Sequence, residues 1–220
     1  MYSDTLEAPT LAAGPIQDLR VRAMIDELCA AARHPEDGGP RRHPGRDPAD
    51  YADYGLSIFR EQGELIYLLC RAMRAHRVVE FATSVGMSTL YFATAMRDNG
   101  GGLVIGSELV PAKVDAARRN LAKAGLDDYA EIRPGDARQT LRNLGGPVDF
   151  ALIDGWPTAS GPSLAREVIE IVAPQLKVGG YVMNDNAEPD FLAFIRDPTN
   201  GFVSITLPLK GGTELAVKVG

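Results

Sequence analysis

From residue 77 to the end of the chain, short apolar runs alternate with amphipathic stretches, and this alternation limits the fold more than any other feature. Short apolar runs bounded by turn residues are typical of buried strands, and the stretches between them have helical spacing. Strands are predicted over residues 78–82, 103–108, 130–133, 148–153, 180–184, 202–207 and 214–219. Helices are predicted over residues 88–97, 111–125, 138–144, 163–176 and 189–196. Such alternation predicts an α/β fold with a doubly wound, mainly parallel sheet of seven strands.

The end of the chain departs from this alternation. No helical stretch separates the last two predicted strands, which flank Lys210, Gly211 and Gly212. A short connection that contains glycine is typical of a hairpin, so the last strand is expected to be antiparallel. Seven strands with this ending distinguish the expected sheet from a six-stranded dinucleotide-binding fold.

The first part of the chain has a different character. Residues 14–32 and 57–75 have helical apolar spacing, and residues 33–48 between them hold four prolines and three glycines. That composition is incompatible with a continuous helix or strand and predicts a long loop. We therefore divide the chain into residues 1–56, which serve as a cap or a dimerisation element, and residues 57–220, which form the main domain. The second helix is expected to bury Leu65, Ile66, Leu68 and Leu69.

Composition argues against several classes of protein. The 220 residues are 45% hydrophobic and 24% charged, with a formal net charge of −6. These values fit a globular domain and argue against nucleic acid or an anionic membrane as the partner. The sequence has neither an apolar run of membrane-spanning length nor a signal-peptide pattern in residues 1–10, so a cytoplasmic location is expected. Cys29 and Cys70 are expected to be buried free thiols.

Acidic residues follow the predicted strands. In open α/β sheets, ligands bind at the carboxyl ends of the strands. The acidic residues at or just after such ends are Glu80, Glu108, Asp136, Asp154 and Asp185. One acidic residue in a loop is ordinary, but five along one edge of a sheet indicate a binding site.

The stretch after the first predicted strand, residues 82–88, favours a cofactor loop. Its small residues let the backbone approach a ligand, and the next helix offers its N-terminal amides. An ordinary tight turn is the alternative. Glu108 ends the second strand 28 residues after Glu80, where a carboxylate can accept hydrogen bonds from both hydroxyls of a ribose. Alternatively, the Glu108 carboxylate stabilises the N-terminus of the next helix. Asp136 either faces an adenine or caps the helix that follows it.

Asp154, Asp185 and Asn186 form a candidate metal site. The two aspartates end strands that are expected to be neighbours, and adjacent strands lie about 4.8 Å apart. Two carboxylates and the Asn186 amide oxygen are hard oxygen ligands of the kind that Mg²⁺ prefers. The alternative is that Asp185 and Asn186 form a turn and that Asp154 caps the following segment.

Taken together, these residues resemble the S-adenosylmethionine-dependent O-methyltransferases of the catechol and caffeoyl-coenzyme-A type, over roughly residues 57–219. The resemblance implies a Rossmann-like methyltransferase fold, S-adenosylmethionine and magnesium as cofactors, and a small hydroxylated, catechol-like molecule as the methyl acceptor. It makes residues 57–220 the catalytic domain and Asp154 a catalytic residue, and a homodimer is expected.

The resemblance also implies roles for single residues. Glu108 would hold the ribose, Ser88 would contact the methionine carboxylate, and Asp136 with Ala137 would border the adenine. The implied cofactor contacts are Glu80, Ala82, Thr83, Gly86, Ser88, Glu108, Asp136, Ala137 and Asp154, and the implied metal ligands are Asp154, Asp185 and Asn186.

Two positions depart from the family pattern. Ala82 stands where the family usually has a glycine, and no lysine base follows Asp154 within residues 155–160. Either a metal ion alone activates the acceptor, or a base comes from the long loop, where the candidates are His34, His43, Tyr51 and Tyr54. Trp156 is a candidate wall of the acceptor site.

The missing lysine keeps an alternative open, a metal-independent methyltransferase that acts on a carboxylate, nitrogen or carbon of a small molecule. A nicotinamide dehydrogenase is disfavoured because the first strand is not followed by a full Gly-x-Gly-x-x-Gly. A non-catalytic cofactor-binding protein is disfavoured because both Asp154 and Asp185 are present.

Overall fold

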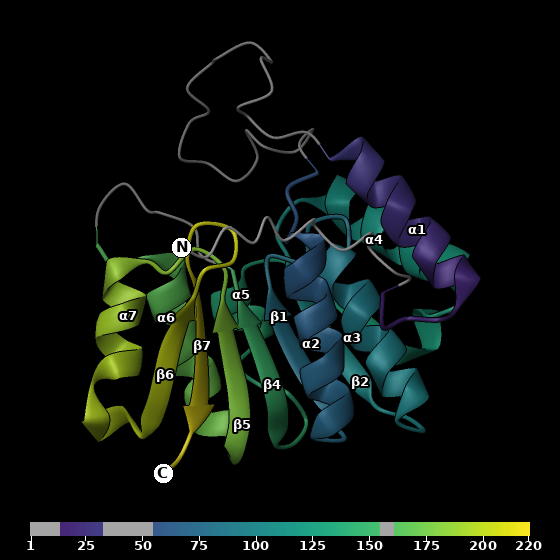
Figure 1. The fold of residues 1–220 in the computed structure, drawn as a ribbon. Coiled ribbons are helices and arrows are strands. Elements are labelled where there is room, and N and C mark those ends of the chain that lie inside the picture. The colour runs from purple at the N-terminus through teal and green to yellow at the C-terminus, as the bar shows by residue number, and fades with distance from the viewer. Residues whose placement is uncertain (1–13, 33–54, 155–160) are drawn as a thin grey trace, which may run out of the picture.

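The computed structural model describes residues 14–32, 55–154 and 161–220, and its centre is one seven-stranded sheet (Figure 1). Its strands are β1 (Arg77–Phe81), β2 (Leu103–Glu108), β3 (Ala130–Pro134), β4 (Val148–Ile153), β5 (Leu176–Asn184), β6 (Phe202–Leu207) and β7 (Thr213–Lys218). The order across the sheet is β3-β2-β1-β4-β5-β7-β6. Strands β1 to β5 are parallel, and β7 is antiparallel to both of its neighbours. The predicted fold class is confirmed, including the antiparallel last strand.

Helices cover both faces of the sheet (Figure 1). They are α1 (Leu19–Ala31), α2 (Arg60–Ala72), α3 (Met87–Asp98), α4 (Pro111–Ala124), α5 (Ala137–Thr140), α6 (Leu164–Val172) and α7 (Pro189–Arg196). In the described residues, short 3-10 turns accompany them: η2 (Asp127–Tyr129), η3 (Ala173–Gln175) and η4 (Pro198–Asn200).

One predicted boundary is wrong at the junction of α6 and β5. The helix ends at Val172 rather than at residue 176, and the strand begins at Leu176 rather than at residue 180. Pro174 lies in the tight turn η3 after the helix, where its missing N–H ends the helical hydrogen bonding. Leu176 then already pairs with Val148 at the start of β4.

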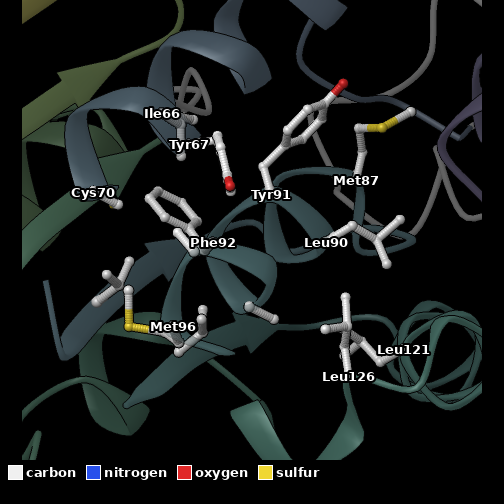
Figure 2. Close-up of a cluster of buried hydrophobic side chains, with 14 of the residues drawn as sticks. Ile66, Tyr67, Cys70, Met87, Leu90, Tyr91, Phe92, Met96, Leu121 and Leu126 are labelled. Carbon is white, nitrogen blue, oxygen red and sulfur yellow. The ribbon is translucent and has the colours of Figure 1, made fainter. Parts of the chain in front are cut away.

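Successive residues of the central strands pack into two different cores. Val78 and Val104 join the cluster under α1, α2, α3 and α4, whereas their neighbours Val79 and Ile105 join the cluster under α5, α6 and α7. This is the alternation of a pleated strand that is buried on both faces. Figure 2 shows part of the first cluster, including Phe92 of α3. The Phe92 ring packs edge-on against the Phe150 ring of β4, with 5.3 Å between the ring centroids.

The N-terminal helix contributes to the core of the main sheet. α1 packs against α3 and α4 and buries Val21, Met24 and Ile25. The division of the chain at residue 56 stays a prediction, because residues 33–54 lie outside the described residues.

Two predictions about burial in this region are wrong. Leu68, expected in the core, is 52% exposed, because it lies two residues beyond the buried Ile66 and so on the opposite side of α2. Cys29 is exposed on α1, whereas Cys70 of α2 is buried as expected, and both thiols are free.

The strand order reverses between β1 and β4. The chain runs outward from β1 to β3 and then returns to place β4 on the other side of β1. At such a point the connections leave toward opposite faces and open a crevice at the carboxyl ends of the strands. The loop after β1 and the end of β4 therefore border the expected ligand site.

Gly63 of α2 makes room for the buried ring of Tyr91 in α3. A Cβ atom at this position would lie 2.2 Å from Tyr91 Cε2. We predict that Gly63→Ala lowers the free energy of unfolding by about 1–3 kcal/mol, the usual cost of overpacking a core. Urea denaturation measures this change. Gly55→Ala is the matched control, because nothing lies within 4 Å of its added Cβ. Equal stability of the two variants would contradict the packing argument.

Candidate active site

The loop after β1 has a backbone that few residues adopt easily. Ala82 and Ser84 have φ values of 66° and 51°, and Gly86, which precedes α3, has φ 89°. Only glycine reaches this left-handed region without steric cost. The Ala82 and Thr83 amides both donate to the Ser107 carbonyl of β2 at 3.1 Å, which holds the loop in place. The family's usual glycine at position 82 thus has a conformational reason, and alanine carries strain there.

Glu80 lies beneath this loop and is fully buried. Its carboxylate accepts hydrogen bonds from Ser88 Oγ at 2.7 Å and Thr89 Oγ1 at 2.5 Å, both in the first turn of α3. Burial raises the pKa of Glu80, while the hydroxyl hydrogen bonds oppose that rise. Glu80 therefore braces the start of α3 against β1. The sequence analysis identified Ser88 but missed Thr89. No motif in the sequence distinguishes Thr89 from an ordinary helix residue.

Glu108 at the end of β2 joins the same loop. Its two carboxylate oxygens accept hydrogen bonds from the Ser84 amide at 2.7 Å and the Val110 amide at 2.8 Å. Ser84 belongs to the β1 loop and Val110 precedes α4, so one carboxylate fixes both connections. The alternative role of Glu108 at the N-terminus of the next helix is observed, and its role as a ribose ligand stays a prediction. Each oxygen retains a further lone pair that can accept a ligand hydroxyl.

One buried hydroxyl of the loop, Ser84 Oγ, has no hydrogen-bond partner among the described residues, whereas the Thr83 hydroxyl lies beside the Glu80 carboxylate and lowers its pKa. Buried polar groups are normally paired, so unpaired ones point to a missing partner such as a ligand. Gly106 of β2 lies against Thr83, and a Cβ there would come within 2.3 Å of Thr83 Oγ1. The loop is thus closely packed on its inner side, and its polar groups suit a small polar ligand.

Asp136 adopts the capping role that sequence reasoning left open. Its carboxylate accepts from the Arg138 amide at 2.8 Å and pairs with the Arg138 guanidinium at 2.6 Å. The Arg138 hydrogen bonds lower the pKa of Asp136, despite partial burial. Asp136 therefore starts α5, and the following Ala137 is buried.

Asp154, at the end of β4, lies beside the end of β5. The predicted neighbourhood of these two strands is confirmed, since Ile153 pairs with Asn184. Asn186 Nδ2 donates to Asp154 Oδ1 at 2.8 Å, so the structure brings these two site residues together. Burial raises the pKa of Asp154 well above its usual value, and the nearby Asp185 charge adds to the rise, whereas Lys210 opposes it.

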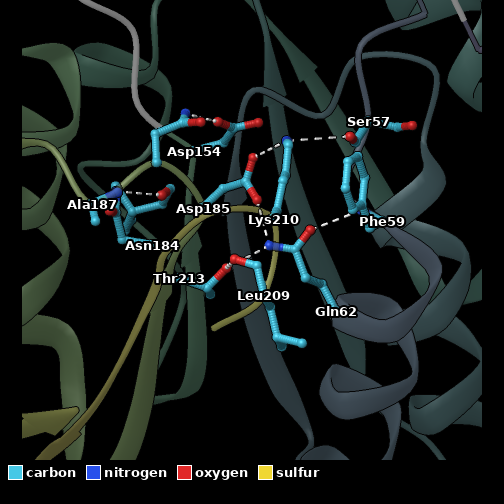
Figure 3. A network of polar contacts seen from close by, with 12 residues as sticks. Ser57, Phe59, Gln62, Asp154, Asn184, Asp185, Ala187, Leu209, Lys210 and Thr213 are labelled. Atoms are coloured by element: carbon cyan, nitrogen blue, oxygen red, sulfur yellow. Dashed lines mark hydrogen bonds and ion pairs between the residues drawn. The ribbon is translucent and has the colours of Figure 1, made fainter. Parts of the chain in front are cut away.

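Asp185 is the centre of a buried network that Figure 3 shows from close by. Its side chain is 1% exposed and has both oxygens engaged. Gln62 Nε2 of α2 donates to Oδ1 at 2.5 Å, and Lys210 Nζ from the β6–β7 hairpin forms an ion pair with Oδ2. Gln62 also donates to Thr213 Oγ1 at 2.8 Å. Two segments far apart in the sequence, α2 and the β6–β7 hairpin, therefore converge on the carboxylate that follows β5.

Sequence reasoning missed two lysines at this edge of the sheet. Lys210 pairs with Asp185, and Lys113 in the first turn of α4 is 7% exposed. Burial lowers the pKa of Lys113, while the charges of Glu108 and Asp154 oppose that change. The predicted topology contained a signal for Lys210. Because β6 runs parallel to β5, the hairpin that follows β6 turns at the same edge of the sheet where β4 and β5 end. Trp156 and the loop candidates His34, His43, Tyr51 and Tyr54 lie outside the described residues.

Comparison with known proteins identifies relatives of this chain. Residues 79–187 match a family model described as a methyltransferase domain. This part of the chain is similar to methyltransferase domains. The chain is 32% identical over 149 residues to a catechol O-methyltransferase of Mycobacterium tuberculosis, a match that covers 63% of this chain and 65% of that protein. A catechol O-methyltransferase of Niastella koreensis is 33% identical over 146 residues, with 60% of this chain and 63% of that protein covered. The matches thus span less than two thirds of either relative's length.

Solved structures extend the likeness over nearly the whole chain. A methyltransferase from Geobacter sulfurreducens superimposes with a TM-score of 0.66 at 20% identity, covering 95% of this chain and 91% of that one. The O-methyltransferase from Bacillus cereus in complex with SAH has a TM-score of 0.65 at 22% identity, covering 93% and 92%. At such identity the likeness shows the fold. Together with the domain match, it confirms the resemblance to S-adenosylmethionine-dependent O-methyltransferases.

We predict that Ala82→Gly raises the free energy of unfolding by about 1 kcal/mol, because glycine relieves the left-handed strain at this position. The same change at Ala116, in the middle of α4, should lower it by about 1 kcal/mol, since that backbone is helical. Thermal or urea denaturation of both variants measures whether the free energy of unfolding rises or falls in each. A loss of stability in Ala82→Gly as large as that in Ala116→Gly would show that the loop carries no strain.

Proposed function

We propose that this chain is an S-adenosylmethionine-dependent O-methyltransferase that acts on a small hydroxylated, catechol-like acceptor. The observation that carries the proposal is the loop after β1, where Glu108 accepts two backbone hydrogen bonds and the Ser84 hydroxyl is buried without a partner among the described residues. The catechol O-methyltransferases that match this chain, and the SAH-bound neighbour from Bacillus cereus, support the cofactor and the acceptor class.

In this proposal the loop of β1 and Glu108 hold the cofactor. The carboxylate of Glu108 receives the ribose hydroxyls, and the first turn of α3, braced by Glu80, directs its free amides toward the methionine end. In the proposal, Ala82, Gly86 and Ala137 contact the cofactor through their backbone. Asp136, which is paired with Arg138, contributes through the position of α5.

The cofactor supplies a sulfonium-bound methyl group, and transfer forms an oxygen–methyl bond while the electron pair of the broken sulfur–methyl bond stays with sulfur. The acceptor hydroxyl must also lose its proton, and a free phenol has a pKa of about 10. We assign this proton to the Asp154 carboxylate, which lies at the end of β4 and accepts a hydrogen bond from Asn186 through Oδ1.

The sequence analysis predicts a Mg²⁺ ion bound by Asp154, Asp185 and Asn186. The donor types suit the ion, but their arrangement does not. Both oxygens of Asp185 already accept from nitrogen donors, and Asn186 directs its amide nitrogen at Asp154. We therefore propose a transfer without a metal ion.

Other features of the proposal come from the sequence alone. The homodimer, the cytoplasmic location and the lack of a nucleic-acid partner stay predictions, as does the alternative of a carboxylate, nitrogen or carbon acceptor. In the part of the chain that the structure describes, no helix is long and apolar enough to cross a membrane.

Calorimetric titration with S-adenosylmethionine tests the cofactor site. Glu108→Gln should weaken binding about 10- to 100-fold, since hydrogen bonds to a charged group contribute about 1.5–3 kcal/mol. Glu131→Gln is the matched control, because Glu131 is an exposed carboxylate on the edge strand β3 that pairs with Arg133. A wild-type protein that binds a nicotinamide cofactor instead, or a Glu108→Gln variant with unchanged affinity and unchanged melting temperature, would contradict the proposal.

Formation of S-adenosylhomocysteine with a panel of catechols tests the transfer. Asp154→Asn should lower kcat by about 100-fold or more, the usual contribution of a general base, with a much smaller change in cofactor affinity. Asp127→Asn, in the exposed turn η2, is the control and should keep wild-type kcat. Methylation of amines or carboxylates with no activity on any catechol would move the protein to the alternative acceptor class.

A further inference from the structure

The ends of β4 and β5 bring two carboxylates together, and the chain supplies a positive charge for them from a distant segment. Asp185 is almost fully buried, and Lys210 Nζ pairs with its Oδ2 (Figure 3). A buried carboxylate is strongly destabilising unless a cation or several hydrogen bonds compensate it. The Lys210 ammonium provides that compensation without any ligand from outside the chain.

The position of the Lys210 ammonium is specified by its own turn and by contacts with Ser57, Phe59 and Asp185. Lys210 has φ 47° and begins a turn with Gly211 and Gly212, both of which also have positive φ, so the hairpin folds back sharply. The ammonium lies 5.5 Å from the centroid of the Phe59 ring, within cation–π range. It also donates to the Ser57 carbonyl at 3.4 Å. The Lys210 side chain is only 24% exposed, so it is held in place by its contacts and does not extend into solvent as a surface lysine does.

Gln62 completes the arrangement on the other oxygen of Asp185. Its amide nitrogen donates to Asp185 Oδ1 and to Thr213 Oγ1, and its amide oxygen accepts from the Phe59 amide at 2.8 Å. Gln62 is fully buried, so this orientation is held from every side. Asp185 thus faces two protonated nitrogens, neither of which can be a metal ligand. A divalent cation at Asp185 would have to expel the ammonium that the fold has placed there.

We infer that Lys210 is the resident cation of this site, supplying at the Asp154–Asp185 pair the positive charge that a divalent metal ion would otherwise supply. The protein then takes no divalent cation at these carboxylates, and an anionic or hydroxylated acceptor that approaches Asp154 meets an ammonium instead. The activity part of this inference rests on the proposed function. The metal-binding part does not.

Titration with Mn²⁺, followed by electron paramagnetic resonance, tests the inference without any acceptor or cofactor. Wild-type protein should show no specific Mn²⁺ binding at this pair. Lys210→Met should bind Mn²⁺ with a Kd at least about tenfold lower than that of the wild type, because the freed Asp185 oxygen becomes a ligand. Lys210→Arg keeps the charge and should stay like the wild type.

The chain offers a matched control for the loss of a buried ion pair. Lys177 Nζ pairs with Asp149 Oδ1 at 2.5 Å, and that side chain of Asp149 is also largely buried. Asp149 lies at the opposite end of β4 from Asp154. Lys177→Met should therefore gain no Mn²⁺ site. Mn²⁺ binding by the wild type as tight as that of Lys210→Met would overturn the inference, and the wild-type titration decides it even if Lys210→Met fails to fold.

An activity series distinguishes this inference from the proposed function. With an accepted catechol, wild-type kcat should change less than about twofold between excess chelator and millimolar Mg²⁺, whereas Lys210→Met should lose activity in chelator and recover part of it with Mg²⁺. Loss of wild-type activity in chelator, restored by Mg²⁺, would refute the resident-cation role. Absence of methyl transfer to every acceptor would refute the proposed function and leave the Mn²⁺ result standing.

Discussion

A buried charge that the chain must compensate from within sets the organisation of this protein. Asp185 is 1% exposed, at a depth where a single carboxylate cannot stay ionised without a partner. Its partners come from α2, through Gln62, and from the β6–β7 hairpin, through Lys210. The antiparallel return of β7 beside β5 is what brings that hairpin to the edge where β4 and β5 end. The Lys210–Asp185 ion pair thus depends on the antiparallel strand β7, which brings the hairpin to the site.

The other half of the crevice depends on backbone geometry. The β1 loop places Ala82 and Ser84 in left-handed conformations, which persist only where the surroundings specify them. Those surroundings are two carboxylates: Glu80, which holds the first turn of α3 from below, and Glu108, which holds the Ser84 amide from the side. Acidic residues at strand ends therefore have two roles here. Some present oxygens to a ligand, and others stabilise the loop that receives it.

The family comparison and the structure inform different parts of the site. The matched methyltransferase domain ends at residue 187 and includes the loop after β1, Glu108, Asp154 and Asp185. Gln62 and Lys210, which determine what Asp185 can bind, both lie outside that stretch. A family resemblance therefore transfers the cofactor half of the site more securely than the charge at the acceptor half.

The sequence by itself determined the seven-stranded doubly wound sheet, its antiparallel end and the set of acidic residues along one edge. These follow from local periodicity and from the rule that ligands bind at strand ends, neither of which needs long-range contacts. Burial was less predictable: Leu68 and Cys29 are exposed because helical spacing alone does not say which side of a helix meets the sheet. The cap formed by Asp136 depended on where Arg138 lies.

Only the tertiary structure decided which cation faces Asp185. The family pattern places a lysine base within a few residues of Asp154. The lysine that reaches this site lies instead 25 residues after Asp185, in a hairpin. Gln62 meets Thr213 across 151 positions of the chain. Sequence patterns report neighbours along the chain, whereas a buried ion pair is selected by which side chains the completed sheet brings within hydrogen-bonding distance.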